Sequence, residues 1–160
     1  MWSEHRDALY RFACWVMQDA AVAEDVVQEC FLAILAKPDR FDPLRGSLRI
    51  FLLGVARNQC RTRWRKASKE VEMVEESAAY DPHILDGLAE REAAAILNEA
   101  LAKLPPLQRE ALYLFEYEGL SLQETAGIGR VPVGTIKARL RRGREGLKRQ
   151  LGWLVKEESK

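Results

Sequence analysis

Residues 119–140 read GLSLQETAGIGRVPVGTIKARL, and this stretch decides the fold of the second half of the chain. Ser121, followed three residues later by Glu124, is the pattern of a capping box, so a short helix is expected to begin there. A tight turn follows, and a longer helix is expected over about 133–151. Ala126 is small where the two helices must approach each other. Two helices joined by a tight turn predict a helix-turn-helix.

The outer face of the second helix is predicted to bind DNA. Ile136 and Leu140 are four residues apart and are expected to face the core, which turns polar and basic side chains outward. The positive end of a helix favours phosphate, and Arg and Lys bind guanine edges or phosphates in a major groove. The predicted contact residues are Thr135, Lys137, Ala138, Arg141, Arg142 and Arg144. The alternative interpretation is a plain helical hairpin with a solvated basic end.

Helical spacing also dominates the first part of the chain. Apolar residues recur at helical intervals over 3–18 and 22–36, and a proline-containing run at 37–39 is expected to end the second helix. A third helix is expected from Ser47, as its cap, to about Ala67. This helix is apolar on more than one face. It therefore needs a second partner besides the first two helices.

The middle of the chain separates two helical parts. Residues 68–82 are polar and acidic without a clear period, which predicts a flexible linker. Helical patterns return over 84–103 and 107–117, and no strand pattern of any weight occurs. The predicted fold is all-α, with two small helical domains joined by a flexible linker and a helix-turn-helix in the C-terminal domain. The predicted divisions are 1–67, 68–99 as an acidic linker with the start of a connecting helix, and 100–160.

The net charge of +1 is the sum of opposite blocks. Residues 57–69 hold six bases and no acid, residues 70–100 hold nine acids and one base, and residues 130–149 hold eight bases and one acid. Two basic segments with an acidic bridge predict two contacts with a polyanion such as nucleic acid. Ordinary solvated helix faces are the alternative.

The composition argues against metal, redox and membrane chemistry. Cys14, Cys30 and Cys60 are scattered, so they are expected to be buried or partly buried free thiols rather than a disulfide framework. His5 and His83 have no ligand partners at useful spacing, and neither a metal nor another cofactor is expected. The apolar stretches are too short to cross a bilayer, so no membrane insertion is expected.

No catalytic constellation is visible in the sequence. It has no phosphate-cradling glycine loop, metal-ligand cluster or nucleophile–base pair, so we do not expect an enzyme. The start of the chain lacks the basic residues and apolar run of a signal peptide, so the expected location is the cytoplasm.

The motif at 119–145 resembles the region that reads the −35 element in extracytoplasmic-function sigma factors, a family of the sigma-70 superfamily. The run from Leu104 to Glu110 resembles the usual lead-in to that region. The family usually has leucine and then glycine in the turn, where Gly129 and Arg130 stand here. A positive φ at Arg130 would cost about 1 kcal/mol, unless the turn is rearranged and Gly129 takes that conformation.

Two further segments extend the resemblance to nearly the whole chain outside the linker. Residues 23–31 are similar to the family segment that grips a coiled coil of RNA polymerase, and residues 41–58 look like its promoter-melting and −10-reading segment. The resemblance implies polymerase binding by Glu24, Asp25, Gln28, Glu29, Phe31 and Leu32. It implies −10 contacts and melting by Arg45, Ser47, Arg49, Asn58, Arg61 and Arg65, with Arg57 adding charge. The loop 41–47 is the expected wall of a pocket for an unpaired base.

The resemblance implies an alternative sigma factor, which binds core RNA polymerase and directs promoter-specific initiation of transcription without a cofactor. The domain 1–67 would then bind the polymerase and open the −10 element, and the C-terminal domain 100–160 would read the −35 element. The linker would occupy a path meant for nucleic acid. No functional homodimer is expected.

Control by an anti-sigma factor is expected on the same ground. The surplus apolar surface of the third helix is its expected docking place, so Leu53→Asp should weaken that partner more than it weakens folding. Two rival functions remain open: a self-sufficient helix-turn-helix repressor or activator that dimerises, and a non-DNA module that titrates a regulator. DNA binding by residues 100–160 and polymerase binding by residues 1–67 would separate them.

Overall fold

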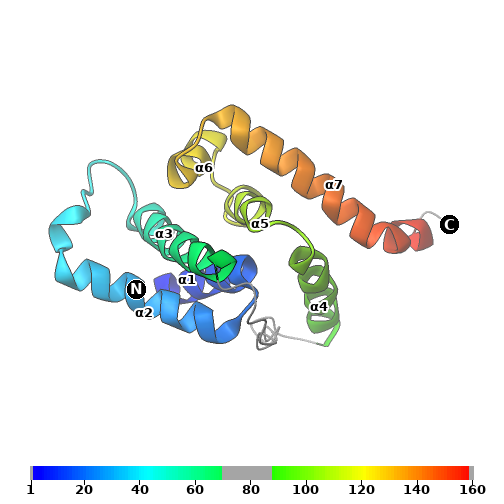
Figure 1. Cartoon of the computed structure of the whole chain (residues 1–160), viewed down its shortest axis with the longest axis horizontal. Coiled ribbons are helices and arrows are strands. Elements are labelled where there is room, and N and C mark those ends of the chain that lie inside the picture. Colours follow the sequence, from blue (N-terminus) through cyan, green and yellow to red (C-terminus); the bar gives the residue numbers. More distant parts are fainter. Residues whose placement is uncertain (1, 70–87, 159–160) are drawn as a thin grey trace. The chain divides into compact units, whose positions relative to one another are not determined.

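The computed structural model describes the backbone of residues 2–69 and 88–158, and the side chains of 3–66 and 92–152 (Figure 1). Every regular element in these ranges is a helix, which confirms the all-α prediction. The chain divides into two compact units, Met1–Tyr80 and Asp81–Lys160. Residues 70–82 of the predicted linker lie outside the described ones. Within the described ranges, no helix has the length and apolar character that a membrane span requires.

The first unit is a bundle of three long helices and a short 3₁₀ turn. Its elements are α1 (Trp2–Met17), α2 (Ala20–Ala36), η1 (Pro38–Arg40) and α3 (Leu48–Lys69). Gln18 adopts a positive φ of 59° between α1 and α2. Asp19 then caps α2, because its carboxylate accepts hydrogen bonds from the N–H groups of Ala21 and Val22 at 3.0 and 3.2 Å. The first break therefore needs only two residues.

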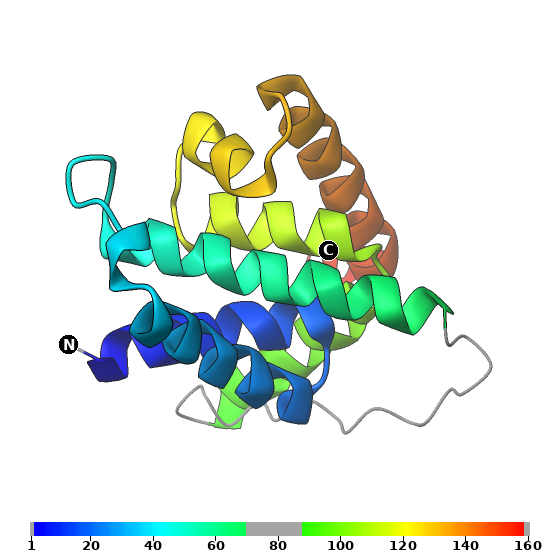
Figure 2. The same cartoon turned by 60° about the vertical axis from the view of Figure 1, so that its left-hand side comes forward.

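The third helix packs against both α1 and α2, as Figure 2 shows from a second side. Leu52 and Leu53 are neighbours in sequence, so they point about 100° apart around the helix, and both are buried. Ile50, Phe51 and Val55 are half-buried, so α1 and α2 cover only part of the apolar surface of α3. Leu53 is fully buried. The expectation that Leu53→Asp would affect a partner more than folding is therefore wrong.

The three cysteines lie in the core of the first unit. Cys14, Cys30 and Cys60 are all free and buried, as predicted. Burial raises the pKa of Cys14 and of Cys30 from about 9 to about 12, because a buried thiolate loses its hydration. These side chains therefore behave as small apolar groups.

The second unit contains α4 (Leu88–Ala102), α5 (Pro106–Leu112), η3 (Tyr113–Tyr117), α6 (Leu122–Gly129) and α7 (Val133–Glu158). The segment η3 continues α5 as a wider π-helix, in which the N–H of Glu118 donates to the carbonyl oxygen of Tyr113 at 2.9 Å. Gly119 ends it with a positive φ of 73°, which glycine adopts without strain. The predicted helix over 107–117 is thus present, with a local widening that the sequence analysis did not foresee.

Two glycines let α7 lie close against the other helices of this unit. A Cβ atom at Gly143 would approach the Leu112 Cδ1 atom to 2.9 Å, and one at Gly146 would overlap the side chain of Leu104. Both glycines are buried. They fix the distance of α7 from α5 and from the α4–α5 turn, while Ile136 and Leu140 anchor its first turns in the core.

Candidate nucleic-acid interface

The helix-turn-helix is fixed at its start by the predicted capping box. The Ser121 hydroxyl accepts the N–H of Glu124 at 3.0 Å, and the Glu124 carboxylate accepts the N–H of Ser121 at 2.9 Å. The Thr125 hydroxyl, which is buried, donates to the Ser121 carbonyl oxygen at 2.8 Å. The two capping-box bonds satisfy N–H groups that a helix start otherwise leaves free. The short helix α6 therefore has a defined first turn.

The turn between α6 and α7 is closed by Arg130 itself. Arg130 has φ 55° and ψ 43°, the left-handed conformation, and its N–H donates to the carbonyl oxygen of Ala126. The N–H of Val131 donates to the same oxygen at 3.2 Å. Gly129 stays within α6, so of the two alternatives the chain adopts the positive φ at Arg130 rather than a rearranged turn with Gly129 in the left-handed conformation. The left-handed residue of the turn is therefore Arg130, and the backbone strain falls on a residue that has a Cβ atom.

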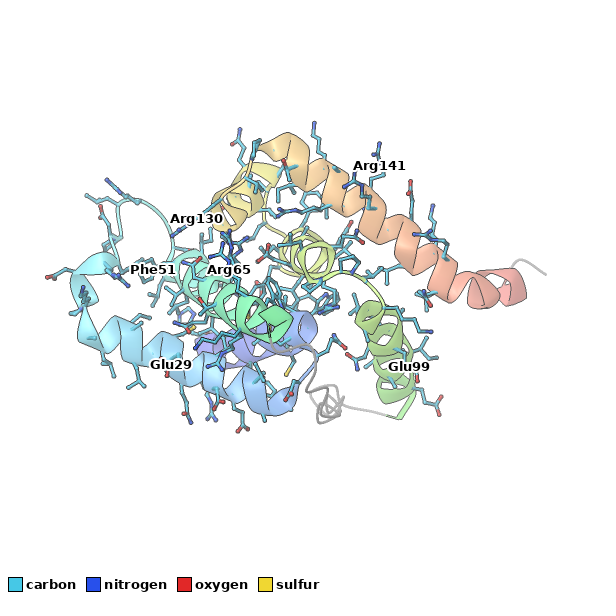
Figure 3. The ribbon with its side chains drawn as sticks, viewed as in Figure 1. Glu29, Phe51, Arg65, Glu99, Arg130 and Arg141 are labelled. Atoms are coloured by element: carbon cyan, nitrogen blue, oxygen red, sulfur yellow. The ribbon has the colours of Figure 1, made fainter. Side chains whose placement is uncertain are left out.

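The first turns of α7 expose most of the side chains predicted to bind DNA. Ile136 and Leu140 are buried, as the spacing predicted. Lys137, Arg141 and Arg142 are exposed, and Arg141 lies on the side of α7 that faces away from α5 (Figure 3). Thr135 and Ala138 are half-buried. This face of α7 can offer cationic hydrogen-bond donors to a polyanion.

Arg144 differs from the other predicted DNA contacts. Its Nε atom donates to Glu116 Oε1 at 2.8 Å, its Nη2 atom contacts the same oxygen, and its guanidinium lies 5.8 Å from the centre of the Phe115 ring. Both charged side chains remain about half exposed. The contact ties α7 to η3, a role that the sequence analysis did not assign to Arg144.

A buried ion pair sets the rotation of α7. The Glu110 carboxylate on α5 is 1% exposed and lies 3.9 Å from the Arg139 guanidinium on α7, whose side chain is 15% exposed. A carboxylate withdrawn from water needs such a partner, because an unpaired buried charge is costly. Arg139 points inward beside the buried Leu140, while Lys137 and Arg141 are exposed, so this pair helps to orient the exposed face.

Arg109 holds the preceding turn in place. Its guanidinium is buried and donates to the carbonyl oxygens of Leu101 and Leu104, the first at 3.3 Å. Burial lowers the pKa of Arg109 to about 10, so the side chain is still protonated at neutral pH. The sequence analysis quoted Arg109 and Glu110 only as part of a lead-in. Their charge within an otherwise apolar helix was the available signal for buried partners.

The exposed face of α2 carries the residues predicted to bind polymerase. Four polar residues and one leucine of this set are exposed: Glu24, Asp25, Gln28, Glu29 and Leu32. Phe31 is half-buried. Leu32 is 58% exposed and Leu35, one turn on, is 71% exposed. This face therefore combines carboxylates with solvent-exposed apolar side chains.

A hollow of about 480 Å³ lies beside the loop that joins η1 to α3. The rings of Phe41 and Phe51 meet in it at 5.5 Å and an angle of 51°. Ser47 lines the hollow and caps α3, because its hydroxyl accepts the N–H of Ile50 at 3.2 Å. The other residues that line the hollow are Asp39, Arg40, Asp42, Arg45, Gly46 and Ile50. The walls thus offer aromatic rings together with donors and acceptors.

The basic residues of α3 are not equivalent. Asn58, Arg61 and Arg65 are three and four residues apart and share one side of the helix, with both arginines exposed. Arg49 is exposed near the start of α3. Arg57 is only 2% exposed, so the expectation that it adds charge for DNA is wrong. Its place on the inner side of α3, one residue after buried Ala56, explains the difference.

Comparison with known proteins identifies the class to which these interfaces belong. The family Sigma-70 region 2 matches residues 1–70, and the family Sigma-70, region 4 matches residues 94–147. The first range contains α2 and the hollow, and the second contains the helix-turn-helix. The chain is therefore a protein of the sigma-70 type.

Comparison with individual relatives shows to which family of sigma-70-type proteins the chain belongs. The chain is 37% identical over 140 residues to the ECF RNA polymerase sigma factor EcfG of Rhodopseudomonas palustris, covering 88% of this chain and 77% of the relative. It is 30% identical over 159 residues to SigW of Bacillus subtilis, covering 92% and 84%. The chain belongs to the extracytoplasmic-function RNA polymerase sigma factors, as the sequence motifs predicted. It is thus a transcription initiation factor that acts with core RNA polymerase on promoters.

Solved structures agree with this assignment. The sigma factor RpoE of Bartonella quintana, crystallised with the anti-sigma factor NepR, matches with a TM-score of 0.79 and 31% identity, over 93% of this chain and 92% of that one. CnrH, solved with the cytosolic domain of CnrY, matches with a TM-score of 0.67 and 25% identity, over 94% and 84%.

Proposed function

We propose that residues 1–67 bind core polymerase and capture the opened −10 element, while residues 100–160 read the −35 element through α7. The observation that carries this proposal is the basic outer face of α7. The capping box at the start of α6 and the ion pair between Glu110 and Arg139 hold this face in position. Binding free energy opens the promoter in this scheme. The chain therefore needs no covalent step, metal or cofactor of its own.

Recognition of the −35 element uses the first turns of α7. In a helix-turn-helix these turns enter the major groove with their side chains toward the base edges. Lys137 and Arg141 are one turn apart on the exposed face and can reach bases or phosphates, and Thr135, Ala138 and Arg142 flank them. Each bidentate base contact of arginine contributes about 1–3 kcal/mol of discrimination.

Capture of the −10 element uses the hollow and one side of α3. An unpaired base needs a pocket with a stacking surface and hydrogen-bonding groups. Phe41 and Phe51 supply rings at the hollow, and Arg45 and Ser47 supply polar groups. Asn58, Arg61 and Arg65 lie farther along the same helix. At a rise of 1.5 Å per residue, Arg65 is about 25 Å from the start of α3. These three side chains would follow the single strand rather than share the pocket.

Binding to polymerase uses the exposed face of α2. Carboxylates at Glu24, Asp25 and Glu29 suit a basic helical partner, and Leu32 supplies the apolar centre that such an interface needs. The chain would act as one copy in the holoenzyme, in the cytoplasm where the polymerase works. A self-sufficient repressor would have no use for this face.

We propose that an anti-sigma factor holds the chain inactive; this is supported by the likeness to RpoE, which was crystallised in complex with the anti-sigma factor NepR. Leu53 is buried, so it does not offer the docking place expected from the sequence, whereas Ile50, Phe51 and Val55 on α3 are half-buried. Leu32 and Leu35 on α2 are the exposed apolar pair. A partner that covers them would compete directly with core polymerase.

The test is run-off transcription by a bacterial core polymerase on a pool of random promoter fragments, with and without this protein. Protein-dependent start sites that share two upstream sequence blocks are the expected result. If no new starts appear although a pull-down shows that the same core binds the protein, the proposed function is wrong. Core that does not bind is replaced by another bacterial core before the assay is interpreted.

A further inference from the structure

The tip of the loop between η1 and α3 presents an apolar side chain to solvent. Leu44 is 95% exposed, more than any other large hydrophobic residue among those whose side chains are described. Pro43 beside it is also exposed. The loop projects from the helices of its own unit in Figure 2. A leucine in this place contributes nothing to the core of the first unit.

The tip is held in one shape by Asp42. Its Oδ1 atom accepts the N–H of Leu44 at 2.9 Å, and its carbonyl oxygen accepts the N–H of Arg45 at 3.0 Å. Its Oδ2 atom lies 3.7 Å from the Nε atom of Arg45. Pro43 fixes one further backbone angle. Three contacts around one aspartate and a proline therefore present Leu44 on a preorganised turn rather than on a loose loop.

The tip also adjoins the hollow, since Asp42 and Arg45 on either side of it line that space. Proteins that bend or open DNA insert apolar wedges such as leucine between stacked bases, next to cations that hold the backbone. We propose that Leu44 is such a wedge: it inserts beside the base held in the hollow and separates that base from its neighbour in the stack. This inference rests on the proposed role of the hollow.

The experiment compares two forms of a promoter recovered by the run-off selection. One is fully paired, and the other carries a mismatched bubble over the −10 element. Opening of the paired form is followed by the fluorescence of 2-aminopurine placed in that element. The variants are Leu44→Ser, which keeps the exposed site but removes the apolar bulk, and Leu44→Met, which keeps a flexible apolar side chain.

Leu44→Ser should open the paired promoter about tenfold more slowly and act within about twofold of the native chain on the bubble, because only the paired form has a stack to separate. Leu44→Met should remain within about twofold on both. Equal loss on both forms would show that Leu44 holds the base rather than wedging the stack. Weaker binding of Leu44→Ser to core polymerase would show that Leu44 contacts protein rather than DNA. An unchanged rate of opening would show that Leu44 has no role in opening the promoter.

Arg45→Ala separates this inference from the function on which it rests. Loss of activity with Arg45→Ala on the bubble supports the hollow as the base site, whatever Leu44 does. If Arg45→Ala has no effect on either form while Leu44→Ser does, the assignment of the hollow fails, and a wedge beside a base held in the hollow is ruled out with it.

Discussion

Arg130 occupies a backbone conformation that usually belongs to glycine. Its φ of 55° brings the Cβ atom close to the following carbonyl oxygen, at a cost of about 1 kcal/mol. Arg130→Gly should therefore raise the free energy of unfolding by about 0.5 kcal/mol at most, the strain relieved less the entropy that glycine adds to the unfolded chain. Urea denaturation measures this difference.

Arg130→Ala is the matched control for this substitution. It removes the same charge from the basic block at 130–149 but keeps a Cβ atom at the strained position. No gain is expected from it. An equal gain for alanine and glycine would mean that charge repulsion, rather than the left-handed backbone, limits stability here.

The buried thiols give a pH dependence whose sign follows from their pKa. Cys14 and Cys30 have a pKa of about 12 in the folded chain and about 9 when exposed. Their contribution to stability is therefore full below pH 9 and is lost as the pH rises from 9 toward 12, because unfolding then releases protons. Thiol labelling at pH 8 should be slow in buffer and fast in denaturant. Rapid labelling of the folded chain would contradict their burial.

Among the helices, α7 is the element whose position matters most, and Gly146 controls it. Gly146→Ala adds a Cβ atom that overlaps the side chain of buried Leu104, so that side chain or the helix must shift. The expected loss of stability is about 1–3 kcal/mol. Gly152→Ala is the control, since nothing lies within 4 Å of its Cβ position and helix propensity alone favours alanine by about 1 kcal/mol. Thermal or urea denaturation of both variants tests the prediction.

The outer face of α7 gives a second prediction for the same element. Lys137→Ala with Arg142→Ala should weaken binding to −35 DNA and reduce the slope of log K against log salt by about 0.9 for each lost phosphate contact. Binding to core polymerase should stay unchanged. Both side chains are exposed, so the fold is spared.

Lys148→Ala with Arg149→Ala removes the same charge from exposed positions farther along α7. This pair should leave recognition of the −35 element nearly intact. If both pairs weaken DNA binding equally, the effect is general attraction to the polyanion, and the proposed contacts at the first turns of α7 are not supported.

The helices themselves were predictable from sequence because local signals specify them. The capping box at Ser121, the proline after α2 and the spacing of Ile136 and Leu140 all act within one or two turns. The inward turn of Arg139 toward Glu110 was not predictable, because it depends on two helices that meet only after folding. For the same reason, the sequence did not show that Leu53 lies in the core that α3 forms with α1 and α2.

At the scale of the whole molecule, the two units allow a division of labour. The fragment 81–160 should bind −35 DNA without polymerase, and the fragment 1–80 should bind core polymerase without DNA. Pull-down and electrophoretic mobility shift measure the two activities, after circular dichroism has shown that each fragment is helical.

These fragments also separate the rival functions. A self-sufficient repressor would bind paired DNA half-sites as a dimer, with no affinity for core polymerase in the fragment 1–80. A module that titrates a regulator would show no DNA binding by the fragment 81–160. Either result would contradict the division of roles proposed for this sigma factor.

The pair of Glu110 and Arg139 has a consequence for how the promoter preference of this chain can change. It anchors α7 from the inside together with Gly143 and Gly146, so the pose of the helix does not depend on the residues that face outward. Positions 137, 138 and 141 are then free to change without loss of the scaffold. A new promoter preference can arise by few substitutions, and a library confined to these positions would evolve sigma factors for orthogonal gene circuits.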